Sequence, residues 1–373
     1  MSSAPVLFEV TPEPAWTAEE RIPEVRIAGR WLTPTPVFDT YWRFAAARQA
    51  IYEARIAGTP GPWTDDLVLR NHRFTNCFRA ADRVSQFLIR HVSYGGDQAV
   101  EEVVFRTLLF KFFNRISTWE LLFEALGTPT WATFDLPAYG AVLGRAFASG
   151  HRLYSAAYVI PPPRQGAPRK YLNHLLLLQT MMRDRLPAKL AESASMNDAF
   201  NLLRSYPAIG DFLAFQFVID LNYSTVLDFD EMDFVVAGPG ARDGIRKVFG
   251  PESTGIEAEV IRYMAETQSQ HFARLGLDFE GLHGRPLQLV DCQNLFCEVD
   301  KYARVVHPTV RGVSGRSRIK QRFSPIADPV PAWFPPKWGI NQAVGDSCSQ
   351  SLPASRSLRL VCTELEAVGD LPE

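Results

Sequence analysis

The chain has 373 residues, of which 46% are hydrophobic, and it carries a formal net charge of −2 at neutral pH. It is long enough to bury a substantial core, either as one large domain or as two ordinary ones. The slightly negative charge excludes nucleic-acid binding through overall charge, so any contact with DNA must use local basic patches. The sequence has no apolar run of membrane-spanning length and no signal-peptide pattern, which predicts a soluble cytoplasmic protein.

The cysteines are typical of a protein in a reducing compartment. They number five and are scattered along the chain as Cys77, Cys292, Cys297, Cys348 and Cys362. An odd, scattered set favours reduced thiols over a disulfide framework. Cys292 and Cys297 lack a second nearby pair, so their spacing does not match a zinc site. We therefore expect no metal and no cofactor, and the sequence gives no sign of an obligate protein partner.

Both ends of the chain differ in composition from its middle. Residues 1–36 are rich in Pro, Thr and Glu without sustained periodicity, which is typical of an arm or linker. Residues 324–373 begin with a segment of five prolines, SPIADPVPAWFPPKW, and are then polar and weakly patterned. We expect this tail to be disordered or to lie on the surface through Trp333, Phe334 and Trp338. The folded body is therefore expected at residues 37–323.

Helical periodicity dominates this body. Helices are expected, in chain order, at Asp39–Ile56, Phe74–His91, Val100–Gly127 and Tyr171–Met182. Ala156–Pro163 has the pattern of a strand and runs into a basic loop. We therefore predict an all-α, mainly helical fold with at most a small β element.

Polar residues stand out in two of the predicted helices. In the predicted helix Phe74–His91, a row of polar residues opposite the apolar stripe is either a solvent-exposed face or the wall of a site. In the predicted helix Val100–Gly127, Lys111 lies within an apolar run. A buried cation needs a partner, and the candidate partners of Lys111 are Asp82 and Glu102. The candidate pocket for a base and its sugar consists of Asn76, Arg79, Arg83, Lys111 and Asn114.

A helix-hairpin-helix element is expected at residues 202–221. Met196–Ser205 has a helical pattern, the sequence YPAIG interrupts it, and Asp211–Leu221 resumes it. Gly210 would allow positive φ or the close approach of another backbone. The unpaired N–H groups that follow Ile209 would lie at the positive end of the second helix, where a DNA phosphate can bind. An ordinary corner between helices is the alternative.

A carboxylate follows this hairpin. Asp230 lies twenty residues after Gly210, at the apparent start of another helix. Here the sequence resembles the helix-hairpin-helix DNA glycosylases, in which such an aspartate stabilises the cationic sugar as a flipped base departs. The resemblance makes Asp230 the candidate catalytic residue, with Asp228 and Asp233 as fallbacks. A helix-capping role for Asp230 with Asp233 is the alternative.

Two departures from that superfamily restrict the chemistry. Members that also cleave the DNA backbone carry a lysine shortly after the hairpin glycine, where this chain reads Asp211-Phe212-Leu213. The four-cysteine iron–sulfur motif of other members is absent from the sequence. The resemblance therefore implies a monofunctional, metal-free glycosylase.

The stretch from Lys301 to Arg322 is strongly basic. It holds seven cations and no acidic residue: Lys301, Arg304, Arg311, Arg316, Arg318, Lys320 and Arg322. Such a tract neutralises DNA phosphates, although a solvated basic loop is the alternative. The expected contacts with the DNA backbone are Ile209, Gly210, Arg242, Arg316, Arg318 and Lys320. A second contact region is expected around Arg164, Arg169 and Lys170.

Four further segments resemble a narrower family of proteins: Pro62–Gln86, Phe105–Arg115, Asp233–Arg242 and Cys297–Arg304. Together with the hairpin, they resemble the α-glutamyl/putrescinyl thymine pyrophosphorylase clade. The helical domain of that clade is also described as a 5-hydroxymethyl-deoxyuridine (5-hmdU) DNA kinase domain. The resemblance implies a glycosylase-like fold and action on DNA with modified pyrimidines, such as phage DNA.

The residues also bear on the reaction. A kinase would need a loop that cradles phosphates, but no G-x-x-x-x-G-K-[ST] motif occurs, and the glycine-rich segment Gly238–Gly244 lacks the lysine. The leading hypothesis is therefore a DNA glycosylase that flips out and excises a modified pyrimidine in defence against phages. One alternative is a transferase that adds an amine or amino acid to 5-hydroxymethyluracil during thymine hypermodification. Another is a non-catalytic sensor of modified DNA.

Overall fold

The computed structural model describes residues 22–157, 159–324 and 331–344. Within these residues the protein is mainly helical, with fourteen α-helices and one antiparallel hairpin of strands β1 (Val25–Ile27) and β2 (Arg30–Leu32). The prediction of a mainly helical fold with a small β element is confirmed. Among the described helices, none is both long and apolar enough to cross a membrane.

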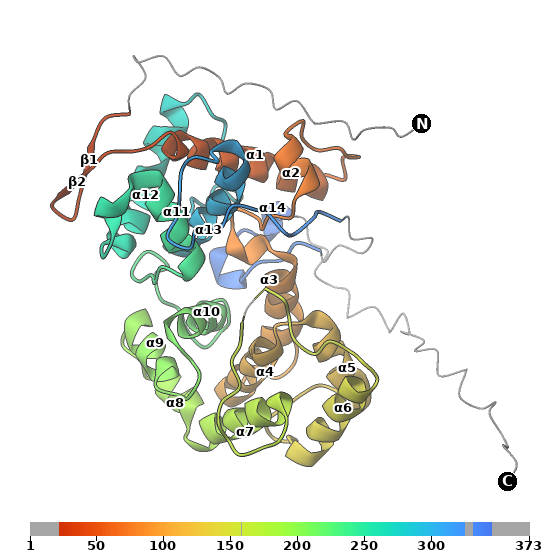
Figure 1. Cartoon of the computed structure of the whole chain (residues 1–373). Coiled ribbons are helices and arrows are strands. Elements are labelled where there is room, and N and C mark those ends of the chain that lie inside the picture. Colours follow the sequence, from red (N-terminus) through yellow and green to blue (C-terminus); the bar gives the residue numbers. More distant parts are fainter. Residues whose placement is uncertain (1–21, 158, 325–330, 345–373) are drawn as a thin grey trace, which may run out of the picture.

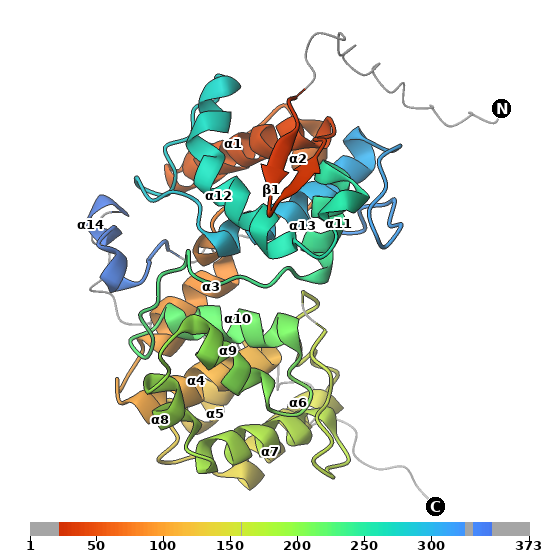
Figure 2. The ribbon, with the colours of Figure 1, turned by 90° about the vertical axis from the view of Figure 1, so that its left-hand side faces the viewer.

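The helices form two lobes, one above the other in Figure 1. The first lobe contains the β-hairpin with α1 (Val37–Ile56), α2 (Leu67–Asn71), α11 (Pro239–Phe249), α12 (Glu257–Arg274) and α13 (Leu289–Val306). The second contains α4 (Val100–Phe113), α5 (Ile116–Leu126), α6 (Leu136–Ala148), α7 (Lys170–Arg183), α8 (Leu186–Ala191), α9 (Met196–Arg204) and α10 (Asp211–Asn222). The chain enters the second lobe through residues 79–93 and returns through 223–238 (Figure 2). The first lobe is therefore assembled from two distant parts of the chain.

An aromatic cluster joins those two parts in the first lobe. Phe38 and Trp42 lie one turn apart on α1, and both are fully buried. Phe38 packs edge-to-face against Phe249 of α11, with ring centroids 5.5 Å apart. Trp42 packs in the same way against Phe272 of α12, at 5.2 Å. Each such pair contributes about 0.5–1.5 kcal/mol beyond its buried area, so α1 is firmly tied to both helices.

Helix α4 forms the centre of the second lobe, as its apolar sequence predicts. Phe112 packs edge-to-face against Phe217 of α10, with centroids 5.7 Å apart. The helix ends at Asn114, which adopts the left-handed conformation with φ 49° while its N–H still donates to the carbonyl of Phe110. A left-handed residue turns the chain away from the helix axis. The predicted single helix Val100–Gly127 is therefore two helices, α4 and α5.

The segment that crosses between the lobes differs from the predicted helix Phe74–His91. It consists of three short pieces, η1 (Arg79–Ala81), α3 (Arg83–Phe87) and the π-helical turn η2 (Leu88–Ser93). Asp82 interrupts them with an extended backbone, φ −67° and ψ 142°. Its carboxylate accepts the N–H of Asn76 at 2.8 Å, so the chain folds back on itself there and a continuous helix is excluded.

The strand predicted at Ala156–Pro163 is also wrong. Residues 156–157 and 159–163 form no strand. The consecutive prolines from Pro161 to Pro163 have no N–H groups for a β-ladder. The carbonyl of Pro161 instead lies 3.0 Å from Nε2 of His174 on α7.

The hairpin of α9 and α10 is present, but its glycine does not act as expected. Gly210 has φ −85°, and a Cβ atom at this position would meet nothing within 4 Å. Ala208 adopts the left-handed conformation instead, with φ 64°. The N–H of Ile209 donates to the carbonyl of Tyr206 at 3.2 Å and closes the turn around Ala208. The expectation that Gly210 supplies positive φ or a close approach is wrong.

Parts of both predicted terminal segments are structured. The β-hairpin lies before residue 37, and residues 331–344 include η4 (Pro336–Trp338) and α14 (Asn341–Val344). Phe334 is fully buried, so this part of the tail packs against the two lobes. Residues 1–21, 325–330 and 345–373 lie outside the described residues, and the domain limits at 36 and 323 stay predictions.

Candidate functional site at the lobe junction

Two cations share one carboxylate where the crossing segment meets the second lobe. Arg79 of η1 donates to both carboxylate oxygens of Asp220 on α10, with Nη1–Oδ1 at 2.6 Å and Nη2–Oδ2 at 2.9 Å. Nζ of Lys111 on α4 lies 2.8 Å from Oδ2 of the same residue. All three side chains are at most 3% exposed. The network therefore joins η1, α4 and α10 inside the protein.

The two cations of this network keep its single carboxylate ionised. Burial opposes ionisation of Asp220, but Arg79 and Lys111 outweigh it and hold the pKa of this carboxyl below its usual value. The partner of Lys111 is thus Asp220, and neither Asp82 nor Glu102 fills that role. Glu102 instead accepts the backbone N–H of Trp131 at 2.6 Å. Removing Asp220 would leave two buried cations without this carboxylate, so its loss is expected to destabilise the fold strongly.

The remaining predicted pocket residues, Asn76, Asn114 and Arg83, have different surroundings. Nδ2 of Asn76 donates to the carbonyl of Ala81 at 2.7 Å, and its Oδ1 accepts a hydrogen bond from Arg48. Asn114 accepts a hydrogen bond from Nζ of Lys111 at 3.0 Å. Both asparagines are buried, whereas Arg83 is exposed. Contact of these residues with a base stays a prediction.

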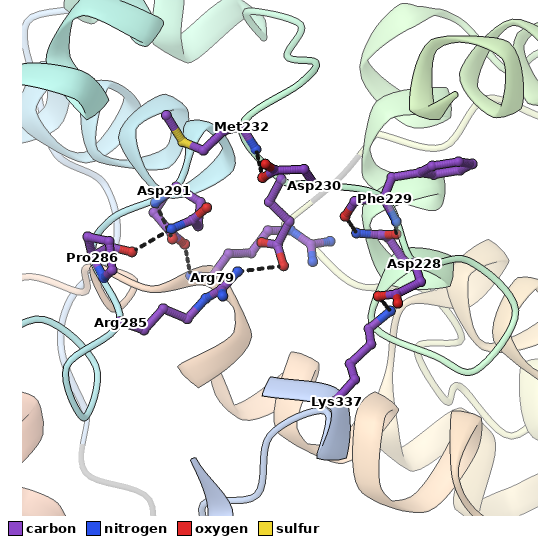
Figure 3. A network of polar contacts seen from close by, with 12 residues as sticks. Arg79, Asp228, Phe229, Asp230, Met232, Arg285, Pro286, Asp291 and Lys337 are labelled. Atoms are coloured by element: carbon purple, nitrogen blue, oxygen red, sulfur yellow. Dashed lines mark hydrogen bonds and ion pairs between the residues drawn. The ribbon is translucent and has the colours of Figure 1, made fainter. Parts of the chain in front are cut away.

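The three candidate aspartates lie on the loop that returns the chain to the first lobe, and Figure 3 shows Asp228 and Asp230. Asp228, Asp230 and Asp233 are all exposed. Oδ1 of Asp230 accepts the N–H of Met232 at 2.9 Å, and its carbonyl accepts the N–H of Asp233 at 3.1 Å. These bonds form a tight turn, and the next helix, α11, begins only at Pro239. The expectation that Asp230 starts a helix is therefore wrong.

Glu231, between these aspartates, points inward. Its Oε1 accepts a hydrogen bond from Nη2 of Arg285 at 2.9 Å, and its side chain is 4% exposed. Burial raises the pKa of this carboxyl to about 7, although Arg285 acts against the shift. The guanidinium of Arg285 lies over the ring of Trp338, 4.2 Å from its centroid. Sequence reasoning missed this pair because Glu231 and Arg285 are far apart in the chain.

A lysine from the predicted tail completes the junction. Nζ of Lys337 donates to the carbonyl of Leu227 at 2.6 Å and lies 3.3 Å from Oδ1 of Asp228 (Figure 3). In the same segment, the N–H of Trp333 donates to Oε1 of Gln86 in α3 at 2.5 Å. Residues 333–338 therefore contact both the returning loop and the crossing segment. The tryptophans at 333 and 338 were the sequence signal for this packing.

The basic stretch forms an exposed strap, which we define as residues 311–322. Arg316, Arg318 and Lys320 are exposed, as is Arg242 on α11. The strap is anchored through its backbone: the N–H of Ser314 donates to Oδ1 of buried Asp243 at 2.6 Å. The strap thus presents its cations to solvent from a fixed path.

The glycine-rich segment Gly238–Gly244 packs helix α11 against α13. A Cβ atom on Gly244 would lie 2.1 Å from the carbonyl oxygen of Phe296, and one on Gly240 would lie 3.0 Å from Sγ of Cys297. Glycine at these positions lets the two helix backbones approach closely. The structure therefore gives this segment a packing role.

The helical hairpin is a weaker phosphate-binding site than the sequence predicts. Gly210 caps α10 without a side-chain hydrogen bond, and Ile209 is buried. However, Asp211 lies in the first turn of α10, where its Oδ1 pairs with Nε of Arg204 at 2.5 Å. This carboxylate already lies at the positive end of the helix and would repel a second anion. Phosphate binding by the hairpin stays a prediction.

Comparison with known proteins identifies the class of domain. Residues 35–312 match the family described as "5-hmdU DNA kinase, helical domain", and the chain therefore belongs to this family. It is similar to a protein described as "5-hmdU DNA kinase" from Bacillus phage SP10, with 28% identity over 294 residues. That match covers 72% of this chain and 45% of the phage protein, so the chain spans less than half of that relative. No solved structure matches the chain.

The family corrects the leading hypothesis on function. Family and relative are both named for a kinase, which transfers a phosphoryl group, whereas a glycosylase cleaves the bond between base and sugar. The expectation of a monofunctional DNA glycosylase, a hydrolase that leaves an abasic site, is therefore wrong. The likeness to the 5-hmdU DNA kinase helical domain is confirmed. The missing G-x-x-x-x-G-K-[ST] motif misled the sequence argument, because that motif concerns binding of the phosphate donor and its absence does not exclude the helical domain of a kinase.

Proposed function

We propose that this chain recognises 5-hydroxymethyluracil in DNA and presents its hydroxymethyl group for phosphorylation. The observation that carries the proposal is the family match over residues 35–312, which includes Arg79, Lys111, Asp220 and the returning loop of the junction and ends at the start of the strap. The phage relative acts, by its description, on 5-hmdU in DNA. We assign no residue of the lobe junction or of the strap to the phosphate donor.

The proposed reaction balances as a simple phosphoryl transfer. The hydroxymethyl oxygen attacks the terminal phosphorus of a nucleoside triphosphate, the new O–P bond forms, and the nucleoside diphosphate leaves. The hydroxyl proton passes to a carboxylate. Asp230 is our candidate acceptor because it is exposed on the returning loop, whereas Asp228 is paired with Lys337. Asp233, which is also exposed, is the fallback.

The strap supplies the matching contact with DNA. Arg316, Arg318 and Lys320 are exposed and would neutralise backbone phosphates, with Arg242 as a further cation. Such contacts position the duplex without reading its sequence, so recognition of the modified base falls to the junction. The substrate we propose is therefore DNA, with the modified pyrimidine turned out of the helix toward the returning loop.

A second candidate function follows from the narrower likeness to the α-glutamyl/putrescinyl thymine pyrophosphorylase clade. That clade would replace a pyrophosphate on the 5-methylene group of the base with an amine or amino acid. The segments Pro62–Gln86 and Asp233–Arg242, which carry the likeness, include Arg79 and the last of the three aspartates. Both candidate reactions change the 5-substituent and leave the glycosidic bond intact.

The test uses duplex oligonucleotides that contain one 5-hmdU or one thymidine at the same position. Each is incubated with the protein, Mg²⁺ and ATP, and the nucleosides are then analysed by mass spectrometry. Affinity for both duplexes is measured by fluorescence anisotropy. We expect tighter binding of the 5-hmdU duplex and a product that carries one added phosphoryl group.

The outcomes separate the candidates. In a parallel incubation, a duplex whose 5-hydroxymethyl group carries a pyrophosphate is given putrescine or glutamate, and transfer of either to the base with release of pyrophosphate would replace the kinase proposal by the second candidate. Equal affinity for both duplexes, without any change in the nucleosides, would contradict both. Asp230→Asn should lower the rate by about a hundredfold or more, the usual contribution of a proton acceptor, whereas Arg183→Gln on the exposed end of α7 should leave it unchanged.

A further inference from the structure

A cavity of about 420 Å³ opens on the second lobe between the end of α6 and the start of α7. Its lining is aromatic and basic, and includes Phe147, Arg152, Tyr154, Arg169, Lys170 and Tyr171. None of its lining residues is acidic. The volume falls within the range of about 300–1,000 Å³ that is typical of small-ligand sites. A pocket with this lining attracts anions.

Two of the cations are held in place by aromatic rings. Nζ of Lys170 lies 4.0 Å from the centroid of the Tyr154 ring, and the guanidinium of Arg169 lies 5.3 Å from that of Phe147. Cation–π contacts of this kind restrict long side chains that would otherwise sample many rotamers. Burial also lowers the pKa of Lys170, so a bound anion would relieve an existing desolvation cost.

The Tyr154 ring is itself fixed by a buried histidine. Nε2 of His174 lies 3.0 Å from the carbonyl of Pro161, which can only accept, so this nitrogen carries the proton. Nδ1 is then the acceptor for the hydroxyl of Tyr154, at 2.8 Å. The histidine ring stacks on Phe112 of α4, with centroids 5.3 Å apart. One wall of the pocket is thus rigidly connected to the core of the lobe.

The first turn of α7 adds a second source of positive potential. Arg169 is the N-cap of this helix of fourteen residues, and no side chain caps its first N–H groups. Because Lys170 and Tyr171 lie in this first turn and line the pocket, the positive end of the helix is at its edge. The cavity, its cations and the helix end therefore favour the same kind of ligand.

We infer that this pocket binds a nucleotide, with the phosphate on Arg152, Arg169 and Lys170 and the base or sugar against the aromatic wall. Phe147 is 49% exposed and supplies an apolar surface that water would otherwise cover. The same chemistry is found in a free nucleoside triphosphate and in a nucleotide of single-stranded DNA. The pocket shares no lining residue with the lobe junction, so this inference and the proposed function can fail separately.

The experiment measures binding of two probes to the full chain. The first is a fluorescent ATP analogue with a trinitrophenyl-labelled ribose, and the second is a short fluorescein-labelled oligothymidylate. The test variant combines Arg169→Gln and Lys170→Gln, and Arg152→Gln on the rim serves as an independent single variant. Arg183→Gln is the matched control, because Arg183 is an exposed cation in the last turn of the same helix, α7, and does not line the pocket.

We expect the double variant to weaken one probe by about tenfold or more, since charge-assisted hydrogen bonds to phosphate are worth at least that much. Arg152→Gln should weaken the same probe less, and Arg183→Gln should leave it unchanged. Loss of the ATP analogue alone identifies a free nucleotide as the ligand, and loss of the oligonucleotide alone identifies a DNA strand. Unchanged affinity for both probes in the double variant, or an equal loss in Arg183→Gln, would overturn the inference.

Discussion

The lobe junction and the strap are both rich in cations, but the two regions use them differently. At the junction, Arg79 and Lys111 are enclosed and bonded to Asp220. In the strap, Arg316, Arg318 and Lys320 are exposed, and the backbone supplies the anchor through Ser314. The same residue types therefore stabilise the fold in one region and remain open to a ligand in the other. Burial and the presence of a carboxylate decide between these roles, and neither is visible in the local sequence.

The largest expected effect is a loss of stability on removal of the carboxylate that pairs with the buried cations of the lobe junction. Asp220→Ala leaves two enclosed cations without their carboxylate and should lower the free energy of unfolding by about 3–5 kcal/mol. Chemical denaturation followed by circular dichroism measures the change. The control is Asp211→Ala, which breaks the half-exposed pair with Arg204 and should cost at most about 1 kcal/mol. Equal losses in the two variants would remove the distinction between enclosed and exposed pairs.

A second prediction concerns Glu231. Its pKa in the folded state, about 7, lies above the ordinary value of 4.5, so the folded protein holds this proton more tightly. The stability that protonated Glu231 contributes is therefore lost as the pH rises from about 4.5 toward 7. Glu231→Gln cannot titrate and should gain about 3 kcal/mol relative to the wild type between pH 4.5 and pH 8.

Thermal unfolding of both proteins across this range measures that gain. The control is Glu266→Gln, since the Glu266 side chain is 58% exposed and its variant should follow the wild type at every pH. A constant difference between Glu231→Gln and the wild type would mean that Glu231 does not titrate in this range.

The contrast between enclosed and exposed positions extends to two glycines, Gly244 and Gly210. Gly244→Ala should cost about 1–3 kcal/mol, because the new Cβ would lie 2.1 Å from the Phe296 carbonyl oxygen. Gly210→Ala should change stability by less than about 0.5 kcal/mol, because its backbone is ordinary and no atom lies within 4 Å. Urea unfolding of the two variants decides the point, and the reverse order would restore the special role of the hairpin glycine.

The smallest effect on stability is expected in the strap. The triple variant Arg316→Gln, Arg318→Gln and Lys320→Gln should change the free energy of unfolding by less than about 0.5 kcal/mol. Its affinity for DNA should fall, and the slope of log affinity against log salt should decrease by about 3. Arg183→Gln, an exposed cation on the second lobe, serves as the control. An unchanged salt slope in the triple variant would exclude the strap as a phosphate contact.

The sequence predicts the helical class and the buried elements well, because periodicity reports which side of an element faces the core. Helices α1 and α4 lie where the apolar pattern places them. The breaks were not predictable in the same way. Asn114 and Asp82 end helical runs through conformations and hydrogen bonds that depend on their neighbours in space.

The candidate site was less predictable because its contacts join distant residues. Arg79 and Asp220 are separated by 141 residues, and no periodicity in either segment marks the other as its partner. Glu231 was hidden among exposed aspartates, and Lys337 lay in a proline-rich segment expected to be a tail. Composition alone identified the strap, since a run of cations without acids is visible in the sequence itself.

The segment around Lys337 also sets the order in which the protein can be completed. Residues 333–338 contact α3 and the returning loop, both of which are synthesised far earlier. A nascent chain can form each lobe as it emerges, but the junction gains these bonds only after the segment has left the ribosome. Until then, Asp228 lacks its lysine and Arg285 lacks the ring of Trp338. Closure of the junction is therefore a late event of synthesis.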